Sequence, residues 1–173
     1  MHDSVRTANL LGATALAVTD LVLADVARAA GVGTSAAAAL VVLSATPGIS
    51  VTEVGRRIGL SQPAAARMVT TLEAADLAHR RAGSGREVSV QLTPAGERAA
   101  SELLAARGRP LTELLSALGP AQQAALADLL TPLLARLYSQ VGNSELLCRL
   151  CDRASCTSGA TCPIGQAERE RDG

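Results

Sequence analysis

The sequence predicts a mainly α-helical protein that carries one small β-hairpin. Apolar residues recur with helical spacing along most of the 173-residue chain, and 48% of its residues are hydrophobic, which excludes a disordered chain. One segment after residue 77 changes to an alternating pattern, which is typical of a strand. The chain has one Tyr and no Phe or Trp. Its core must therefore be built from Leu, Val, Ala and Ile, a composition that suits closely packed helices.

Long apolar helices are expected at both ends of the chain. The first covers residues 3–30, and leucine-rich helices follow residue 93, with a break or bend expected at Gly108 and Pro110. A small domain cannot bury this much apolar surface alone, and a twofold homodimer is the commonest way to bury it. We therefore expect residues 1–33 and 98–141 to form a helical dimerisation region.

Two short helices joined by a tight turn are expected between these ends. Ser50 and Glu53 have the spacing of a capping box, and Gly59 ends the helix that they begin. Ser61 caps the next helix, whose outward face is small and polar except for Arg67. This layout is typical of a helix-turn-helix, in which the second helix reads DNA.

A β-hairpin is expected directly after the second helix. Residues 87–92 alternate in polarity, and the glycine-rich segment 83–85 supplies the turn. The segment from His79 to Arg86 carries three arginines and no acidic residue: Arg80, Arg81 and Arg86. A solvated surface hairpin is the alternative, but a hairpin in this place is expected to be a wing. Residues 34–97 are thus predicted to form a winged helix-turn-helix DNA-binding domain.

The basic side chains of this protein are all arginines. The 16 basic and 16 acidic residues give a formal net charge of zero, and the chain contains no Lys. Arg suits paired hydrogen bonds to phosphate or guanine, although a GC-rich coding bias gives the same usage. Since the total charge is neutral, any attraction to DNA must come from local clusters such as the hairpin arginines.

The first helix is predicted to be a poor membrane span. Its apolar segment from Leu10 to Val32 is interrupted by Asp20, Asp25 and Arg28. The N-terminus also lacks the basic run and unbroken apolar stretch of a secretion signal. We expect a cytoplasmic protein without a membrane partner, whose cysteines lie in a reducing compartment.

Four cysteines form a compact motif near the C-terminus, with the pattern C-x2-C-x4-C-x5-C-P. In a reducing compartment such a cluster indicates a bound metal or a redox function rather than structural disulfides. An iron-sulfur cluster is favoured because compact runs ending in Cys-Pro occur in bacterial ferredoxin motifs. Zinc, reversible disulfides and inert surface thiols remain alternatives. Residues 142–173 are predicted to be a metal-binding tail, with these ligands: Cys148, Cys151, Cys156 and Cys162.

The region from Val54 to Glu97 resembles the MarR family of bacterial regulators. The resemblance rests on Gly-Leu-Ser-Gln-Pro at 59–63 and Leu-Thr-Pro-Ala-Gly-Glu at 92–97, and it extends to about Val141. It implies a triangular dimer in which the second helix enters the major groove and the wing reaches the minor groove. The residues that match the family's recognition helix and wing tip are Ser61, Gln62, Pro63, Arg67, Thr70, Thr71 and Arg86. The family usually has an Asp shortly before the wing-tip Arg, and here the turn is Gly-Ser-Gly.

These patterns predict a sequence-specific transcriptional regulator that binds a roughly palindromic double-stranded operator as a homodimer. We expect the iron-sulfur cluster or redox state of the cysteine motif to control DNA binding. One alternative is a small-molecule-responsive repressor with a structural zinc site, and a remote one is a protein-interaction or electron-transfer module. An enzyme is not expected, because His2 and His79 have no neighbours that form a nucleophile-base pair.

Overall fold

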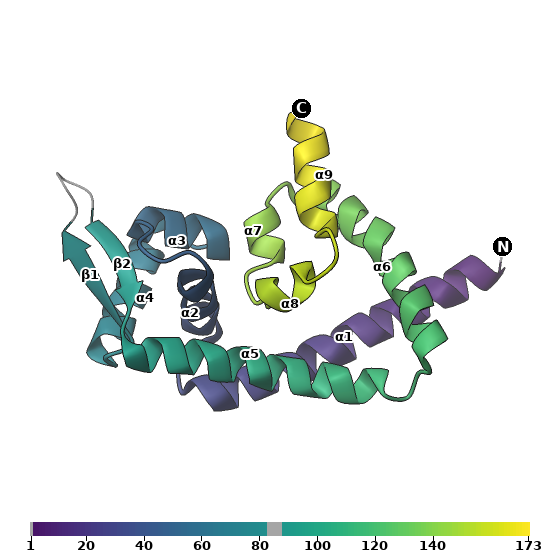
Figure 1. The fold of residues 1–173 in the computed structure, drawn as a ribbon, viewed down its shortest axis with the longest axis horizontal. Coiled ribbons are helices and arrows are strands. Elements are labelled where there is room, and N and C mark those ends of the chain that lie inside the picture. Colours follow the sequence, from purple (N-terminus) through teal and green to yellow (C-terminus); the bar gives the residue numbers. More distant parts are fainter. Residues whose placement is uncertain (1, 83–87) are drawn as a thin grey trace.

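The computed structural model describes residues 2–82 and 88–173, which form an elongated helical molecule with a hairpin at one end (Figure 1). The elements in chain order are α1 (His2–Ala30), α2 (Thr34–Ala45), α3 (Val51–Ile58), α4 (Gln62–Ala74), β1 (Ala78–Ala82), β2 (Val88–Leu92), α5 (Pro94–Leu115), α6 (Pro120–Val141), α7 (Ser144–Leu147), α8 (Arg153–Thr157) and α9 (Pro163–Asp172). The predicted fold class, mainly α with a small β-hairpin, is confirmed.

The hydrophobic core surrounds α2, which is buried along most of its length. This helix is apolar on every side, as expected for a helix enclosed by others, and it packs against α1, α3, α4, α5 and β2. The largest side chains that are fully buried in this core are aliphatic: Val26, Leu40, Leu43, Val54, Val69, Leu72, Val90 and Leu103. The core thus joins the helix-turn-helix to the long helices α1 and α5.

The predicted helix-turn-helix is formed by α3 and α4. The Ser50 side chain accepts a hydrogen bond from the backbone N–H of Glu53 at 3.2 Å and so caps α3. Gly59 ends α3 in the left-handed conformation, with φ of 75°. A Cβ atom at Gly55 would lie 2.8 Å from the Cβ of Ala65. The absence of a side chain at Gly55 therefore allows α3 and α4 to cross closely.

The hairpin is antiparallel and is anchored to the segment before α3. Its register pairs Ala78 with Leu92 and Ala82 with Val88. The buried Val90 donates its backbone N–H to the carbonyl of Ile49 at 2.8 Å. These bonds hold the hairpin beside the helix-turn-helix in the position of a wing. The predicted turn, including Arg86, lies outside the described residues.

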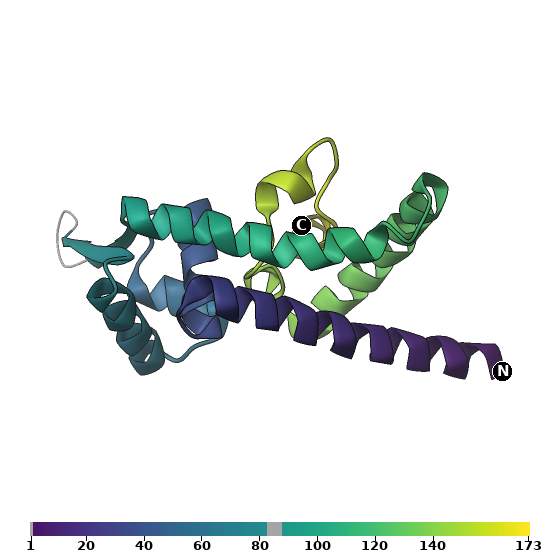
Figure 2. The same ribbon diagram turned by 90° about the horizontal axis from the view of Figure 1, so that it is seen from below.

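Helix α5 is continuous through Gly108 and Pro110, so a break there is wrong, while a bend at these residues stays a prediction. Proline removes one backbone hydrogen bond, but Leu103 and Ala106 on the preceding turns are buried and α5 packs along both α1 and α2. Figures 1 and 2 show α1 and α5 running side by side. Tertiary packing thus outweighs the local cost of the proline.

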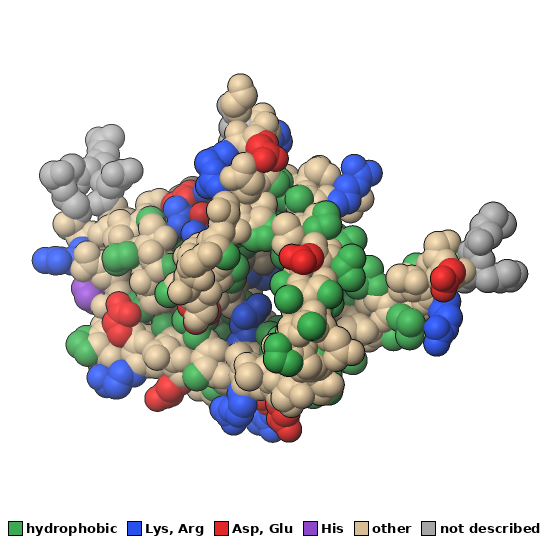
Figure 3. Space-filling view, turned by 45° about the vertical axis from the view of Figure 1, so that its right-hand side comes forward, with side chains coloured by type: hydrophobic (Ala, Val, Ile, Leu, Met, Phe, Trp, Pro, Cys, Tyr) green, Lys and Arg blue, Asp and Glu red, His purple; other side chains and the backbone are tan. Residues whose placement is uncertain are grey.

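The two terminal helices leave a broad apolar surface open. Figure 3 shows hydrophobic side chains gathered along α6 and on the projecting arm of α1. The large exposed residues there are Val5, Leu10, Leu11, Leu16, Leu21, Leu129, Leu130, Leu133, Leu137 and Val141. Residues 3–26 are also long and apolar enough to cross a membrane by length and composition, and very few of them are buried. An exposed apolar surface of this extent is typical of a site that binds another protein or a membrane.

The C-terminal tail folds back onto the rest of the chain. Figure 1 shows α7 and α8 between the helix-turn-helix and α6, with α9 packed against α6. Leu150 packs against the main core. Tyr138 of α6 is buried, and the Arg171 guanidinium lies 4.8 Å from the centre of its ring. The cysteine segment is thus held in a defined place against the helix-turn-helix.

Candidate functional site

The outward face of α4 presents most of the residues predicted to contact DNA. Ser61 is the N-cap of α4, and its side chain makes no capping hydrogen bond. The exposed residues on and beside this face are Ser61, Gln62, Pro63, Arg67, Thr70 and Thr71. The hydroxyls of Thr70 and Thr71 donate to the carbonyls of Ala66 and Arg67 at 3.0 and 3.1 Å, and Thr70 also accepts from Arg80 at 3.3 Å. In this arrangement each hydroxyl oxygen keeps a lone pair that can accept a hydrogen bond from a ligand. The structure brings these side chains onto one face, and their contact with DNA stays a prediction.

Arg80 is held by α4. Its backbone N–H donates to Glu73 at 2.9 Å, its guanidinium forms an ion pair with the same carboxylate, and it also donates to the Ala66 carbonyl at 3.1 Å. These contacts tie β1 to the recognition helix and compensate the charge of Arg80. No local sequence pattern links residue 73 to residue 80, so this positioning role is visible only in the folded structure.

The second hairpin arginine is more accessible. Arg81 is exposed, and its guanidinium donates to Gln91 on the neighbouring strand at 3.3 Å. A neutral partner leaves the positive charge of Arg81 in place for attraction to phosphate. Arg86 lies outside the described residues, so the structure places neither its side chain nor the turn that carries it.

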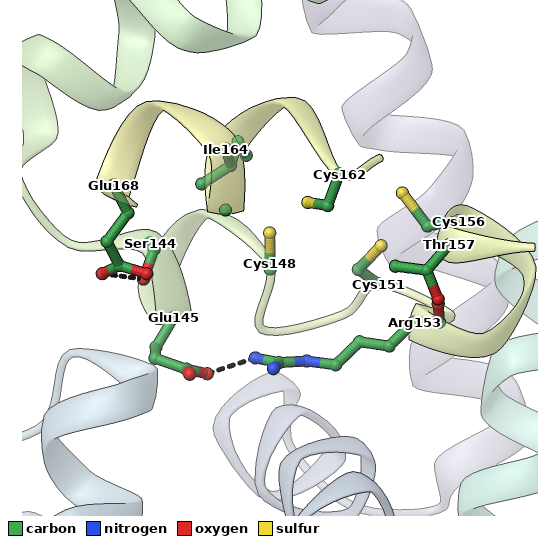
Figure 4. Close-up of a pocket in the computed structure, with 11 residues that line it drawn as sticks. Ser144, Glu145, Cys148, Cys151, Arg153, Cys156, Thr157, Cys162, Ile164 and Glu168 are labelled. Carbon is green, nitrogen blue, oxygen red and sulfur yellow. Dashed lines mark hydrogen bonds and ion pairs between the residues drawn. The ribbon is translucent and has the colours of Figure 1, made fainter. Parts of the chain in front are cut away.

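The four cysteines line one open cavity of about 160 Å³ (Figure 4). Cys148 ends α7, Cys156 belongs to α8, and Cys162 precedes α9. The backbone N–H of Cys151 donates to the carbonyl of Cys148 at 2.9 Å, which turns the chain between the first two thiols. Helix α7 ends at Leu147, before Cys151. A turn, rather than a helix face, brings the first two thiols to the same cavity.

The thiols influence one another through hydrogen bonds. Cys148 donates to Cys151, which raises the pKa of Cys148 and lowers the pKa of Cys151 to about 6. Cys156 and the guanidinium groups of Arg107 and Arg153 lower the pKa of Cys151 further. Desolvation of its sulfur raises the pKa of Cys156 to about 11, although the residue as a whole is exposed. Cys151 is therefore the thiol most readily ionised, and a thiolate is the form that binds metals.

The volume of the cysteine cavity can be compared with the space that a bound metal ion or cluster needs. Within residues 2–82 and 88–173, no three His, Cys, Asp or Glu side chains already stand close enough to hold a single metal ion. Zinc needs four sulfurs at about 2.3 Å from one point. The cavity is instead much larger than the roughly 10–15 Å³ that one water requires. The four thiols have the chemistry to hold a metal ion or a cluster, and which group binds here stays a prediction.

A second cavity, of about 300 Å³, lies between α1, α5 and the tail. Apolar side chains such as Val22 and Leu111 line it together with two arginines, Arg107 and Arg149, so its surface is nearly as polar as it is apolar. Apolar side chains with a few charged groups are typical of small-molecule sites. This arrangement suits an anionic compound with an apolar body.

Comparisons with known proteins agree with this fold. Residues 30–87 match the family model described as MarR family. YusO from Bacillus subtilis is 23% identical, with a TM-score of 0.67 over 77% of this chain and 96% of its own. A mutant of S. aureus MepR bound to an oligodeoxyribonucleotide is 16% identical, with a TM-score of 0.59 over 76% of this chain and 97% of its own.

A third solved structure holds a small molecule. Mycobacterium tuberculosis RV2887 in complex with salicylic acid is 26% identical, with a TM-score of 0.53 over 71% of this chain and 95% of its own. No curated protein gives a significant match to the sequence. The matched segment covers the helix-turn-helix, and the shared fold extends over the long helices that flank it. The chain therefore contains a segment that matches the MarR family model, and it shares the winged-helix fold of these solved structures.

Proposed function

We propose that this chain is a homodimeric regulator whose binding to a DNA operator is controlled by an iron-sulfur cluster in its C-terminal tail. The observation that carries the proposal is the convergence of four cysteines into one cavity on a tail that packs against α3. A cofactor bound there would sit beside the helix-turn-helix. In this proposal, the cysteine cavity that senses the signal therefore lies in contact with the helix-turn-helix that binds DNA.

The reading site is the exposed face of α4 with the wing. An exposed recognition helix of this kind enters the major groove, where an Arg or Gln side chain pairs with purine edges. Arg67 and Gln62 are the exposed side chains of these types on α4. Ser61 at the helix N-terminus suits a phosphate oxygen. The similar MepR structure bound to an oligodeoxyribonucleotide supports the same use of this fold.

The dimer would bury the apolar surfaces of α1 and α6. Leu16 and Leu129 are 71% and 65% exposed in the single chain, and a symmetric partner would remove both from water. This function makes α1 a protein-protein contact rather than a membrane span, and it is consistent with a cytoplasmic regulator. Two recognition helices related by a twofold axis would read a roughly palindromic site.

The cluster would be held by Cys148, Cys151, Cys156 and Cys162. When bound, an iron-sulfur cluster supplies a centre that responds to oxidants and nitric oxide by changing charge or falling apart. The chain provides four thiols, the easily ionised Cys151, and the positive side chains of Arg107 and Arg153 nearby. These arginines would stabilise the negative charge of the thiolates.

The decisive experiment is an ultraviolet-visible spectrum with iron, sulfide and zinc analysis on full-length protein purified without oxygen. A brown protein with broad visible bands and matching iron and sulfide supports the cluster. A colourless protein with one zinc per chain would overturn the cluster. The single Tyr and the lack of Trp leave little protein absorption to obscure either result.

A second function is favoured by the cavity between α1, α5 and the tail. RV2887 forms a complex with salicylic acid, and Arg107 and Arg149 in this chain would pair with the carboxylate of a similar compound. In that case the protein is a small-molecule-responsive repressor and the cysteines hold structural zinc. The metal analysis above separates the two functions.

Arg67→Ala is expected to weaken binding to a preferred DNA sequence by roughly tenfold or more, because one bidentate base contact is worth about 1–3 kcal/mol. The measurement is fluorescence anisotropy with a duplex selected from a random pool by the unaltered protein. Arg109→Ala is the matched control, since it removes an exposed arginine from the second half of α5. Equal losses of DNA affinity in both variants would show that Arg67 on α4 makes no contact specific to the DNA sequence.

A further inference from the structure

The segment that carries α7 is the contact between the tail and the helix-turn-helix. The side chain of Asn143, the N-cap of α7, donates to the carbonyl of Arg56 in α3 at 3.3 Å. Leu146 lies so close to the turn that its Cδ1 would be 3.0 Å from a Cβ atom at Gly59. Cys148, the first thiol of the cavity, ends this same short helix. A movement of the cysteines therefore acts directly on α7, and α7 contacts the first half of the helix-turn-helix.

One carboxylate oxygen of α7 is shared between the cavity and α3. Oε2 of Glu145 forms an ion pair with Arg153, whose side chain lines the cysteine cavity, and it lies 3.8 Å from Nη1 of Arg57. Figure 4 shows the Arg153 side chain extending past Cys151 to reach Glu145. The side chains of Arg57 and Glu145 are 15% and 19% exposed, so solvent screens this pair less than an open surface pair. The two arginines thus compete for the same acceptor.

Arg57 is well placed to transmit a change in this pairing. Its Nε donates to Glu53 at 2.7 Å and its Nη1 donates to Thr46 at 3.0 Å. Glu53 also binds Arg56, and both arginines hold the pKa of Glu53 at about 2. Arg57 therefore joins the start of α3 to the end of α2, which lies at the centre of the core. A new partner for Arg57 changes how α3 is tied to the rest of the domain.

We propose that Glu145 couples the cysteine cavity to the helix-turn-helix by changing its partner from Arg153 to Arg57. The inference rests on the proposed function, because it needs a centre bound by the cysteines. Four thiolates around a doubly positive core keep a net negative charge, whether the core is zinc or an iron-sulfur cluster. That charge attracts Arg153 towards the sulfurs. Glu145 then pairs with Arg57 alone and ties α3 more tightly to the tail.

The test is hydrogen exchange of the α3 amides in the full-length protein, with and without Cd²⁺ as the thiolate-binding probe. Loading is followed independently by the ultraviolet absorption of the cadmium-thiolate bonds. We expect loading to slow exchange in α3 of the unaltered protein by roughly fivefold or more, the lower end of typical coupling between sites. Glu145→Gln is expected to bind Cd²⁺ with no change in α3.

Glu168→Gln is the matched control. Glu168 lines the same cavity, but it accepts a hydrogen bond from Ser144 at 2.7 Å and belongs to α9. This variant is expected to respond to Cd²⁺ as the unaltered protein does. The inference is overturned if Glu145→Gln keeps the full response, if Glu168→Gln loses it too, or if loading leaves α3 of the unaltered protein unchanged. In each of these cases the absorption still reports the metal site, whereas a lack of loading would overturn the site and the coupling together.

Discussion

Gly96→Ala is expected to lower the free energy of unfolding by about 3 kcal/mol or more, at the upper end of the cost of overpacking. Gly96 lies in the first turn of α5, beside the backbone of Leu77, which leads from α4 into β1. An added Cβ would stand 1.9 Å from the carbonyl oxygen of Leu77 and 3.3 Å from the Cβ of Leu92. The Leu77 oxygen already accepts the backbone N–H of Thr93 at 3.1 Å. Backbone must therefore move, and the contact between the wing and α5 must open.

Urea denaturation at a fixed protein concentration measures this effect, because a dimer's stability depends on concentration. Gly108→Ala is the matched control in the same helix, since nothing lies within 4 Å of the position of its added Cβ. It is expected to raise stability by roughly 0.5–1 kcal/mol, because Ala favours the helix over Gly. Similar urea midpoints of unfolding for the two variants would show that a side chain at residue 96 does not clash with the backbone of Leu77.

Cys151→Ser is expected to abolish the visible absorption of the protein and reduce bound iron and sulfide to near zero. Cys151 is the central thiol of the cavity, because Cys148 and Cys156 both donate hydrogen bonds to it and hold its pKa at about 6. A serine hydroxyl does not ionise near neutral pH and is a poor replacement for a thiolate ligand. The DNA affinity of this variant is expected to be insensitive to oxidant and nitric oxide.

The metal analysis and the DNA titration are made on protein purified without oxygen. Thr157→Ser is the matched control, because Thr157 lines the same cavity without supplying a thiol, and its hydroxyl donates to the Arg153 carbonyl at 2.8 Å. This variant is expected to keep its colour and its response. If Cys151→Ser remained brown and still responded to oxidant, the cysteine cavity would not be the sensor.

Most of the fold follows from local patterns in the sequence. Ser50 and Thr93 cap α3 and α5 through bonds to backbone groups three residues away, and Gly59 ends α3. Such signals act within one turn of chain, so they are visible without the structure. The alternating residues of β2 likewise predict the wing. The exception is Pro110, where burial of the preceding turns keeps α5 continuous against the local preference.

The candidate sites could be predicted from the sequence less completely than the fold. The type and spacing of the exposed α4 residues predict a DNA-reading face, and the cysteine motif predicts a thiol-lined site. The pairing of Arg80 with Glu73 could not be predicted, and it gives that arginine a place in holding β1 against α4. Glu145 carries no sequence signal either, because its partner Arg57 lies on a different element far along the chain.

The sequence by itself determined most of the helix and strand boundaries up to Val141, which residues share the exposed face of α4, and which thiols share a motif. These properties depend on caps, periodicity and spacing, which act over a few residues. Only the tertiary structure decided that the cysteine tail docks on α3 and that one oxygen of Glu145 lies between Arg153 and Arg57. The physical reason is that this docking depends on the packing of Leu146 and Leu150 and on ion pairs between distant segments, which arise only when the whole chain is folded.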